Sequence, residues 1–493
     1  MADAEKSALA IARAKELLQK AYDAQKLFAD FDNERVNRIC ENMARVGYEN
    51  AERLAKMAVE ETGIGKATDK VIKNQFASKN MFEFIKNMKT VGIVNDDPVR
   101  KVVEIAAPMG VVVAIIPTTN PTSTVIFKTM ISLKARNSVV ISPHPRAIKA
   151  CCETARLMNE AAVAAGAPDG LIQCLDVANM DAASELMHNE KTSVILATGG
   201  PGLVKAAYSS GKPAFGVGPG NVPAFIERSA DIDLAVDKIL ASKTFDYGTI
   251  CASEQSIVTE KCIANQVKAA LVRKGAYFVS GEEKDKLSKT VIKPQGGVNA
   301  DVVGKDPRVI AKLAGFTVPD NTRVLIAELN SVGPQEPLSA EKLCPVLGYY
   351  EVNDWMQACE LCFELLNFGG RGHSLSIHSN NKDVIMEFAM KKPVFRILCN
   401  TPSSQGGIGY TTGLSPSLTL GCGTFGNNIT SDNVTPLHLI NTKRLAYYNP
   451  PAGFVLPTVN NAAPAASAVC SDCGYTHADI VAAVEKALRE YRG

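Results

Sequence analysis

Short apolar strands alternate with helical stretches from Val111 onward, and this alternation is the feature that most constrains the fold. The strands and helices are expected, in turn, over residues 111–116, 122–135, 138–141, 146–165, 171–175, 181–188 and 193–196. Strands that alternate with helices of this length are typical of a parallel sheet with helical crossovers. The sequence therefore predicts an α/β fold.

The same alternation resumes near Asp233 after helical periodicity over residues 5–90 and an extended excursion over 95–108. Helices are expected at 234–243 and 260–274, and strands at 256–258, 324–327, 346–350 and 438–441. The stretch 401–433 is rich in Gly, Ser, Thr and Asn, which is typical of a functional loop.

Composition narrows the function classes. The net charge is only +2, which provides no electrostatic case for nucleic acid or a membrane surface as a partner. The N-terminal residues show no apolar signal region, so we expect a cytoplasmic protein. The 13 scattered cysteines are then expected to be reduced, and no metal site is predicted because Cys359 and Cys362 lie in a helical stretch where they pack. The pair Cys470 and Cys473 has no assigned role.

The chain changes character after Tyr448. Residues 449–475 form a linker rich in Pro, Ala and Asn, and residues 476–493 are expected to form a short helix with one apolar face. A helix this short is marginally stable alone. Its apolar face therefore indicates either a partner surface or docking onto its own enzyme.

Cys251 is the leading candidate for a catalytic residue. It follows a glycine turn in the stretch 245–256 and directly precedes a predicted strand. Turns can lower the pKa of a thiol, and the thiolate is the nucleophile. The alternative is a buried cysteine that acts only as a small hydrophobic residue.

Three other segments carry candidate chemistry. Asn120 follows the strand 111–116, where its amide can stabilise an oxyanion, or where it is a plain turn asparagine. The turn 197–204 precedes a helix, and its glycines allow the backbone to approach a pyrophosphate. The glycine-rich segment 216–223 is either a crossover before the Cys251 region or an ordinary surface turn.

Together these segments resemble the aldehyde dehydrogenase superfamily, in the same order along the chain. Residues 117–145, 195–223, 242–256 and 400–423 resemble its CoA-acylating branch, and most of all the aldehyde dehydrogenase half of bifunctional aldehyde–alcohol dehydrogenases. The resemblance covers about residues 5–447 and does not extend to the iron-dependent alcohol dehydrogenase half. It implies a Rossmann-type NAD-binding domain (1–94 and 109–232), a catalytic α/β domain (233–433) and oligomerisation strands (95–108 and 434–448), followed by the linker (449–475) and the amphipathic targeting helix (476–493).

The resemblance also implies roles for single residues. Cys251 would attack the aldehyde, while Asn120 and the Cys251 N–H would form the oxyanion hole. His373 would lie in the active-site region, unless it is a structural turn histidine. The implied cofactor-binding residues are Thr118, Ser142, Pro143, Thr198, Gly199, Gly200, Gly202, Gly218 and Glu341.

Two departures from the hydrolytic members of the superfamily are informative. Val217 or Gly218 stands where those members carry the glutamate that activates water, and neither residue is a general base. The thioester on Cys251 must then await the thiolate of coenzyme A. Ser142 stands where many of them carry a lysine near the adenosine ribose, which favours NAD over NADP.

The predicted reaction is therefore NAD-dependent, CoA-acylating oxidation of a short-chain aldehyde, acetaldehyde or propionaldehyde, by a homodimer or larger homo-oligomer. One alternative substrate is sulfoacetaldehyde, for which Arg371 or Arg396 would supply a cation. Another alternative is a non-catalytic assembly or shell-binding protein. The tail resembles the encapsulation peptides of bacterial microcompartments, so shell proteins are candidate partners of residues 476–493.

Overall fold

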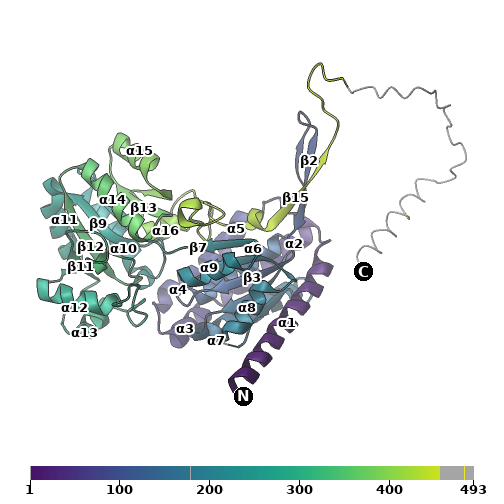
Figure 1. The fold of residues 1–493 in the computed structure, drawn as a ribbon, viewed down its shortest axis with the longest axis horizontal. Helices are drawn as coiled ribbons and strands as arrows, with labels where there is room; N and C mark the ends of the chain where they lie inside the picture. Colours follow the sequence, from purple (N-terminus) through teal and green to yellow (C-terminus); the bar gives the residue numbers. More distant parts are fainter. Residues whose placement is uncertain (1, 178, 456–481, 483–493) are drawn as a thin grey trace, which may run out of the picture. The chain divides into compact units, whose positions relative to one another are not determined.

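A computed structural model describes residues 2–177, 179–455 and 482 (Figure 1). The chain divides into one unit at Met1–Ala446 and another at Tyr447–Gly493. Cys470, Cys473 and almost all of the predicted targeting helix lie outside the described residues, as does most of the predicted linker. Among the residues described, no helix is long and apolar enough to span a membrane.

Helices occupy the N-terminal region, as the periodicity predicts. They are α1 (Ala2–Phe28), α2 (Asn33–Glu49), α3 (Ala51–Thr62), α4 (Ala67–Gln75), a π-helical turn (Phe76–Asn80) and α5 (Met81–Ile85). Asp32 caps α2 by accepting the backbone N–H of Arg35. The helical periodicity predicted over residues 5–90 is confirmed in α2, where Val36, Ile39 and Met43 are buried in the core and Val46 is partly buried against it.

The first sheet is five-stranded and parallel, in the order β5-β4-β3-β6-β7. Its strands are β3 (Val111–Ile116), β4 (Ser138–Pro143), β5 (Ile172–Cys174), β6 (Thr192–Thr198) and β7 (Ala214–Val217). The crossovers are α6 (Pro121–Lys134), α7 (Ile148–Ala164), α8 (Met180–His188) and α9 (Pro201–Ser209). Every residue of the central strand β3 is buried, because helices cover both faces of the sheet. The predicted α/β fold is confirmed.

The second sheet is seven-stranded and parallel, in the order β10-β11-β12-β9-β8-β13-β14. Its strands are β8 (Val222–Ile226), β9 (Glu254–Glu260), β10 (Ala276–Phe278), β11 (Val324–Glu328), β12 (Val346–Val352), β13 (Gly372–His378) and β14 (Val394–Cys399). Its helices are α10 (Ile232–Thr244), α11 (Lys261–Arg273), α12 (Gly281–Val291), α13 (Pro307–Leu313), α14 (Trp355–Gly369), α15 (Lys382–Lys391) and α16 (Ser403–Gly407). Only residues 218–221 separate β7 of the first sheet from β8 of the second, so this glycine-rich segment joins the two sheets.

A third, antiparallel sheet has the order β1-β2-β15, with β1 at Gly92–Asp97, β2 at Val102–Pro108 and β15 at Ile440–Ala446 (Figure 1). The predicted excursion over 95–108 is thus a hairpin that begins at Gly92. The strand predicted over 438–441 is wrong at its start. Pro436–Leu439 forms a 3₁₀ turn, because Thr435 and His438 cap each other and Pro436 has no N–H for a ladder.

Candidate active site

Cys251 lies in a tight turn between α10 and β9. The turn contains a 3₁₀ segment at Phe245–Gly248, in which Asp246 and Tyr247 adopt left-handed φ angles of 49° and 53°. Non-glycine residues rarely adopt this conformation, and where they do the surrounding contacts must hold them. The Cys251 side chain packs against a small apolar cluster that includes Phe76 and Leu420.

The thiol of Cys251 is desolvated although the residue as a whole keeps some exposure. Burial, followed by the electrostatic influence of Glu341 and Cys422, raises the pKa of the Cys251 thiol to about 12, against a smaller lowering effect of Arg396. This is the opposite of the lowering that sequence reasoning expects from a turn. Without ligands, the protein therefore holds Cys251 as a neutral thiol at physiological pH.

Gly220 brings three of the predicted residues together. Its N–H donates to Glu341 Oε1 at 3.0 Å. A Cβ atom at Gly220 would lie 2.1 Å from the Cys251 carbonyl oxygen and 3.2 Å from Cγ of His373. The backbone of the joining segment thus contacts the Cys251 turn so closely that only glycine fits. Cys251, Glu341 and His373 therefore surround one point of the chain.

His373 is fully buried on β13. Its Nδ1 lies 3.0 Å from Ser374 Oγ, while its Nε2 is buried without a hydrogen-bond partner. Burial, together with the nearby positive charge of Arg396, lowers the pKa of His373 to about 3, so the imidazole is neutral near pH 7. A neutral ring with one unsatisfied nitrogen is suited to bind a ligand group rather than to carry charge.

Glu341 is the carboxyl group beside this point. Its desolvation raises the pKa of the side chain to about 7, against the lowering effects of the Gly220 N–H and of Lys243 and Lys342. A carboxyl group with this pKa exchanges a proton readily at neutral pH.

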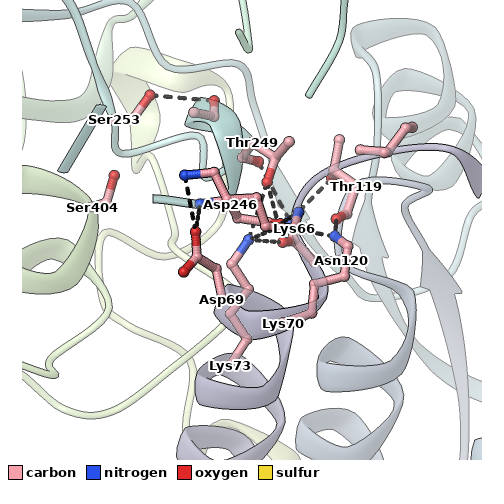
Figure 2. A network of polar contacts seen from close by, with 12 residues as sticks. Lys66, Asp69, Lys70, Lys73, Thr119, Asn120, Asp246, Thr249, Ser253 and Ser404 are labelled. Carbon is pink, nitrogen blue, oxygen red and sulfur yellow. Dashed lines mark hydrogen bonds and ion pairs between the residues drawn. The ribbon is translucent and has the colours of Figure 1, made fainter. Parts of the chain in front are cut away.

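Asn120 directly precedes α6 but does not cap it with its side chain. Its Oδ1 accepts a hydrogen bond from Lys73 Nζ at 2.6 Å, and its Nδ2 donates to Thr119 Oγ1 at 3.0 Å and to the Thr249 carbonyl at 3.4 Å (Figure 2). A plain turn asparagine would cap the helix that follows it. The Asn120 carboxamide instead bridges α4 and the Cys251 turn.

The predicted cofactor residues of the first sheet lie where neighbouring parallel strands end. Thr118 follows β3, Ser142 and Pro143 end β4, and Thr198 ends β6. Ligands of open α/β sheets bind beyond the carboxyl ends of the strands. The Thr198 hydroxyl is buried without a partner, which fits a ligand group that would complete its hydrogen bonding.

The glycine turn before α9 leaves room for such a ligand. Cβ atoms at Gly200 or Gly202 would meet nothing within 4 Å, whereas one at Gly199 would lie 2.7 Å from Leu203 Cδ2. Gly199 thus allows close packing of the turn on α9, and the N-terminus of α9 stays open to an anionic group such as a pyrophosphate. These residues fit a dinucleotide cofactor.

Known proteins resemble this chain over most of its length. The model for the Aldehyde dehydrogenase family matches residues 4–295. The chain belongs to the aldehyde dehydrogenase family. It is 45% identical to the bifunctional aldehyde-alcohol dehydrogenase of Escherichia coli K12 over 441 residues. These aligned residues cover 88% of this chain and 49% of that protein. The chain thus spans about half the length of the bifunctional relatives that it matches.

Solved structures match over nearly their whole length. An acetylating aldehyde dehydrogenase from Geobacillus thermoglucosidasius is 50% identical with a TM-score of 0.89, over 90% of this chain and 98% of that one. A propionaldehyde dehydrogenase from a Clostridium phytofermentans fucose utilisation microcompartment is 31% identical with a TM-score of 0.79, over 88% of this chain and 97% of that one. A Rhodopseudomonas palustris propionaldehyde dehydrogenase with bound CoA and an acylated cysteine is 27% identical with a TM-score of 0.80, over 88% and 97%. The resemblance to acylating aldehyde dehydrogenases inferred from the sequence is confirmed.

Sequence reasoning missed Cys422 and the structural role of Arg396. Cys422 lies near Gly218, where a Cβ atom would be 4.0 Å from its sulfur, and this thiol is one of the neighbouring groups that raise the pKa of Cys251. The sequence suggests Arg396 only as a cation for a sulfonate, yet its guanidinium is buried and donates to the carbonyls of Gly421 and Ser431. The glycine-rich stretch 401–433 was the one available signal for Cys422.

Proposed function

We propose that this protein catalyses the NAD-dependent, CoA-acylating oxidation of a short-chain aldehyde, with acetaldehyde or propionaldehyde as substrate. The observation that carries the proposal is the contact between the Gly220 backbone and the Cys251 carbonyl. In water-using members of the family the joining segment supplies a glutamate. Here it offers Val217 and Gly218, so no carboxylate on this segment can activate water against a Cys251 thioester.

The proposed chemistry follows from the residues around Cys251. Its sulfur attacks the aldehyde carbon, and the oxyanion that develops is stabilised by Asn120 Nδ2 and the Cys251 N–H. Glu341, whose pKa is raised to about 7, is a suitable acceptor for the thiol proton. Bound NAD supplies the acceptor for the hydride that leaves the aldehyde carbon. The acyl group then remains on Cys251 as a thioester and passes to the thiol of CoA, which regenerates the free cysteine.

NAD is proposed over NADP because of the residues at the end of β4. Ser142 is buried and Pro143 has no charge, so neither provides a cation for a 2′-phosphate. The pyrophosphate of NAD would be held by Thr118, Thr198, Gly199, Gly200 and Gly202. Its nicotinamide end would contact Gly218 and Glu341.

The assembly and location are proposals too. The sheet β1-β2-β15 would pair across subunits in a homodimer or larger homo-oligomer, since most of β15 is exposed along its length. Residues 476–493 would bind microcompartment shell proteins and retain the enzyme with its volatile aldehyde, inside a cytoplasmic compartment.

The sulfoacetaldehyde alternative has less support. Arg396 is buried and bonded to backbone carbonyls, and Arg371 stacks on the Phe425 ring at 5.7 Å. The non-catalytic alternative has little support as well, because Cys251 and Asn120 are both present at the site.

The test is NADH formation from acetaldehyde or propionaldehyde, with and without CoA, and with NADP⁺ in place of NAD⁺. We expect turnover only with CoA, preference for NAD⁺, and complete loss in Cys251→Ala. The matched control is Cys262→Ala, which removes an exposed cysteine of α11 and should leave the rate unchanged. Rapid multiple turnover without CoA would show that water resolves the thioester and would overturn the proposal.

A further inference from the structure

A buried cluster of three charged residues and one threonine lies beside Asn120. It consists of Lys70 and Lys73 on α4 and of Asp246 and Thr249 in the Cys251 turn, and each of the four is at most 2% exposed (Figure 2). We propose that Lys73 is a positioning residue for Asn120: its ammonium fixes which end of the Asn120 carboxamide faces the Cys251 turn. The proposal rests on the function proposed above.

The contacts of Lys73 account for all of its hydrogen-bonding capacity. Its Nζ donates to Asn120 Oδ1 at 2.6 Å, to Asp246 Oδ2 at 2.5 Å and to Thr249 Oγ1 at 3.0 Å. An ammonium group has three donors and no acceptor. The Asn120 atom that faces Lys73 must therefore be the oxygen, because a carboxamide NH₂ in that place would set donor against donor.

The opposite end of the carboxamide is then determined as well. Nδ2 faces the carbonyl of Thr249, two residues before Cys251. In this orientation Asn120 can donate to an oxyanion that forms at Cys251. A flipped carboxamide would present the lone pairs of Oδ1 to the same oxyanion and would destabilise it.

Lys73 is itself held in place by the strained turn. Asp246 Oδ2 accepts from Lys70 Nζ at 2.8 Å and from Thr249 Oγ1 at 2.8 Å, in addition to Lys73. Asp246 Oδ1 accepts the N–H of Lys66 at 2.7 Å. A Cβ atom at Gly65 would lie 2.0 Å from the same oxygen, so the carboxylate fits only against glycine. The left-handed φ of Asp246 is thus compensated by ionic contacts that also orient Lys73.

Lys70 provides a matched comparison within the same cluster. It is as buried as Lys73 and shares the Asp246 carboxylate, but its other hydrogen bond goes to the Thr119 carbonyl at 2.7 Å and not to the Asn120 side chain. Loss of either lysine removes one buried ammonium from the cluster. Only loss of Lys73 removes the hydrogen bond to Oδ1 of the Asn120 carboxamide, which leaves the long 3.4 Å contact to the Thr249 carbonyl and the Thr119 hydroxyl to hold its orientation.

The test is a double-mutant cycle on kcat and KM. We expect Asn120→Ala to lower kcat by about 10²–10³-fold, the usual effect of losing one oxyanion donor. Lys73→Met should lower kcat at least tenfold, with KM for NAD⁺ and aldehyde within threefold of wild type. Lys73→Met/Asn120→Ala should be no slower than Asn120→Ala within threefold, because Lys73 acts only through Asn120.

Lys70→Met and Lys70→Met/Asn120→Ala complete the comparison. Lys70→Met should lower the melting temperature as Lys73→Met does, but it should lower kcat less than Lys73→Met. In the double variant, the fold-losses in kcat caused by Lys70→Met and by Asn120→Ala should multiply. The inference would be overturned if the fold-losses in kcat of Lys73→Met and Asn120→Ala multiplied in their double variant. It would also be overturned if kcat of Lys73→Met were no lower than kcat of Lys70→Met.

Asn120→Asp supplies a test that does not depend on how Lys73 variants fold. The aspartate keeps an oxygen for Lys73 and replaces the Nδ2 donor that faces Thr249 with a second, negatively charged oxygen that only accepts hydrogen bonds. Its kcat should fall as far as that of Asn120→Ala, and a wild-type rate would contradict the assigned orientation. A wild-type protein that forms no NADH with CoA present would overturn the proposed function and this inference together. An active wild type with multiplying losses would overturn the inference alone.

Discussion

Asp246→Asn is the substitution whose effect on stability the structure defines most closely. The aspartate carboxylate is fully buried and offsets the ammonium groups of both Lys70 and Lys73. These ion pairs hold the pKa of Asp246 below its usual value despite the opposing effect of burial. Asparagine has the same size and tolerates a left-handed φ, so the change removes the charge without adding backbone strain.

The magnitude follows from the loss of one partner in a buried ionic cluster. Such a loss costs about 3–5 kcal/mol, because the remaining charges stay buried without compensation. The unit Met1–Ala446 has an unfolding entropy of roughly 0.9 kcal/mol/K on the usual per-residue scale. The apparent melting temperature should therefore fall by about 3–6 °C.

Differential scanning calorimetry would measure this shift, with Asp69→Asn as the control. Asp69 is partly exposed, accepts the backbone N–H of Asp246 and forms only a long ion pair with the partly exposed Lys66 at 3.6 Å, so its variant should melt within about 2 °C of wild type. Adding Lys70→Met to Asp246→Asn should restore part of the loss, since one uncompensated ammonium is removed. An Asp246→Asn protein with the melting temperature of wild type would refute the reasoning. So would a double variant whose melting temperature is lower than that of Asp246→Asn.

Two further outcomes depend on pKa shifts. Because the pKa of Cys251 is raised to about 12, its alkylation by iodoacetamide in the ligand-free protein should rise about tenfold per pH unit from pH 7 to 10, as measured by mass spectrometry of the Cys251 peptide, and a plateau near pH 8 would contradict the buried thiol. The pKa of His373 is lowered to about 3, so the folded protein keeps this imidazole neutral while the unfolded chain takes up a proton below about pH 6.5; stability is therefore lost as the pH falls. Between pH 6.5 and 5, the uncharged His373 should lower the free energy of unfolding by about 2 kcal/mol. In urea unfolding, the free energy of His373→Asn should therefore depend less on pH than that of wild type, whereas an equal dependence in both proteins would exclude the lowered pKa of His373.

Much of the fold was predictable from local patterns. The strands at 111–116, 138–141 and 193–196 are apolar, β-branched runs, because both faces of the first sheet are covered by helices. By contrast, β10 has only three residues, and β13 and β14 carry His373, Ser374 or Arg396 within the strand, so no apolar run marked them. These polar residues are tolerated inside the strands because Arg396 donates to backbone carbonyls and His373 contacts the Ser374 hydroxyl.

The sequence by itself determined the α/β class, the nucleophile candidate and the missing glutamate at Val217 and Gly218, since each is a property of a short continuous segment. Only the tertiary structure decided the charge states and the positioning groups. The thiol of Cys251 is neutral because it is desolvated, which no spacing reveals. Asp246 reads as an ordinary loop carboxylate until the fold brings Lys73 against it from 173 positions away in the chain. Burial and long-range ion pairing arise only when distant segments pack together, and they set the chemistry that the local sequence leaves open.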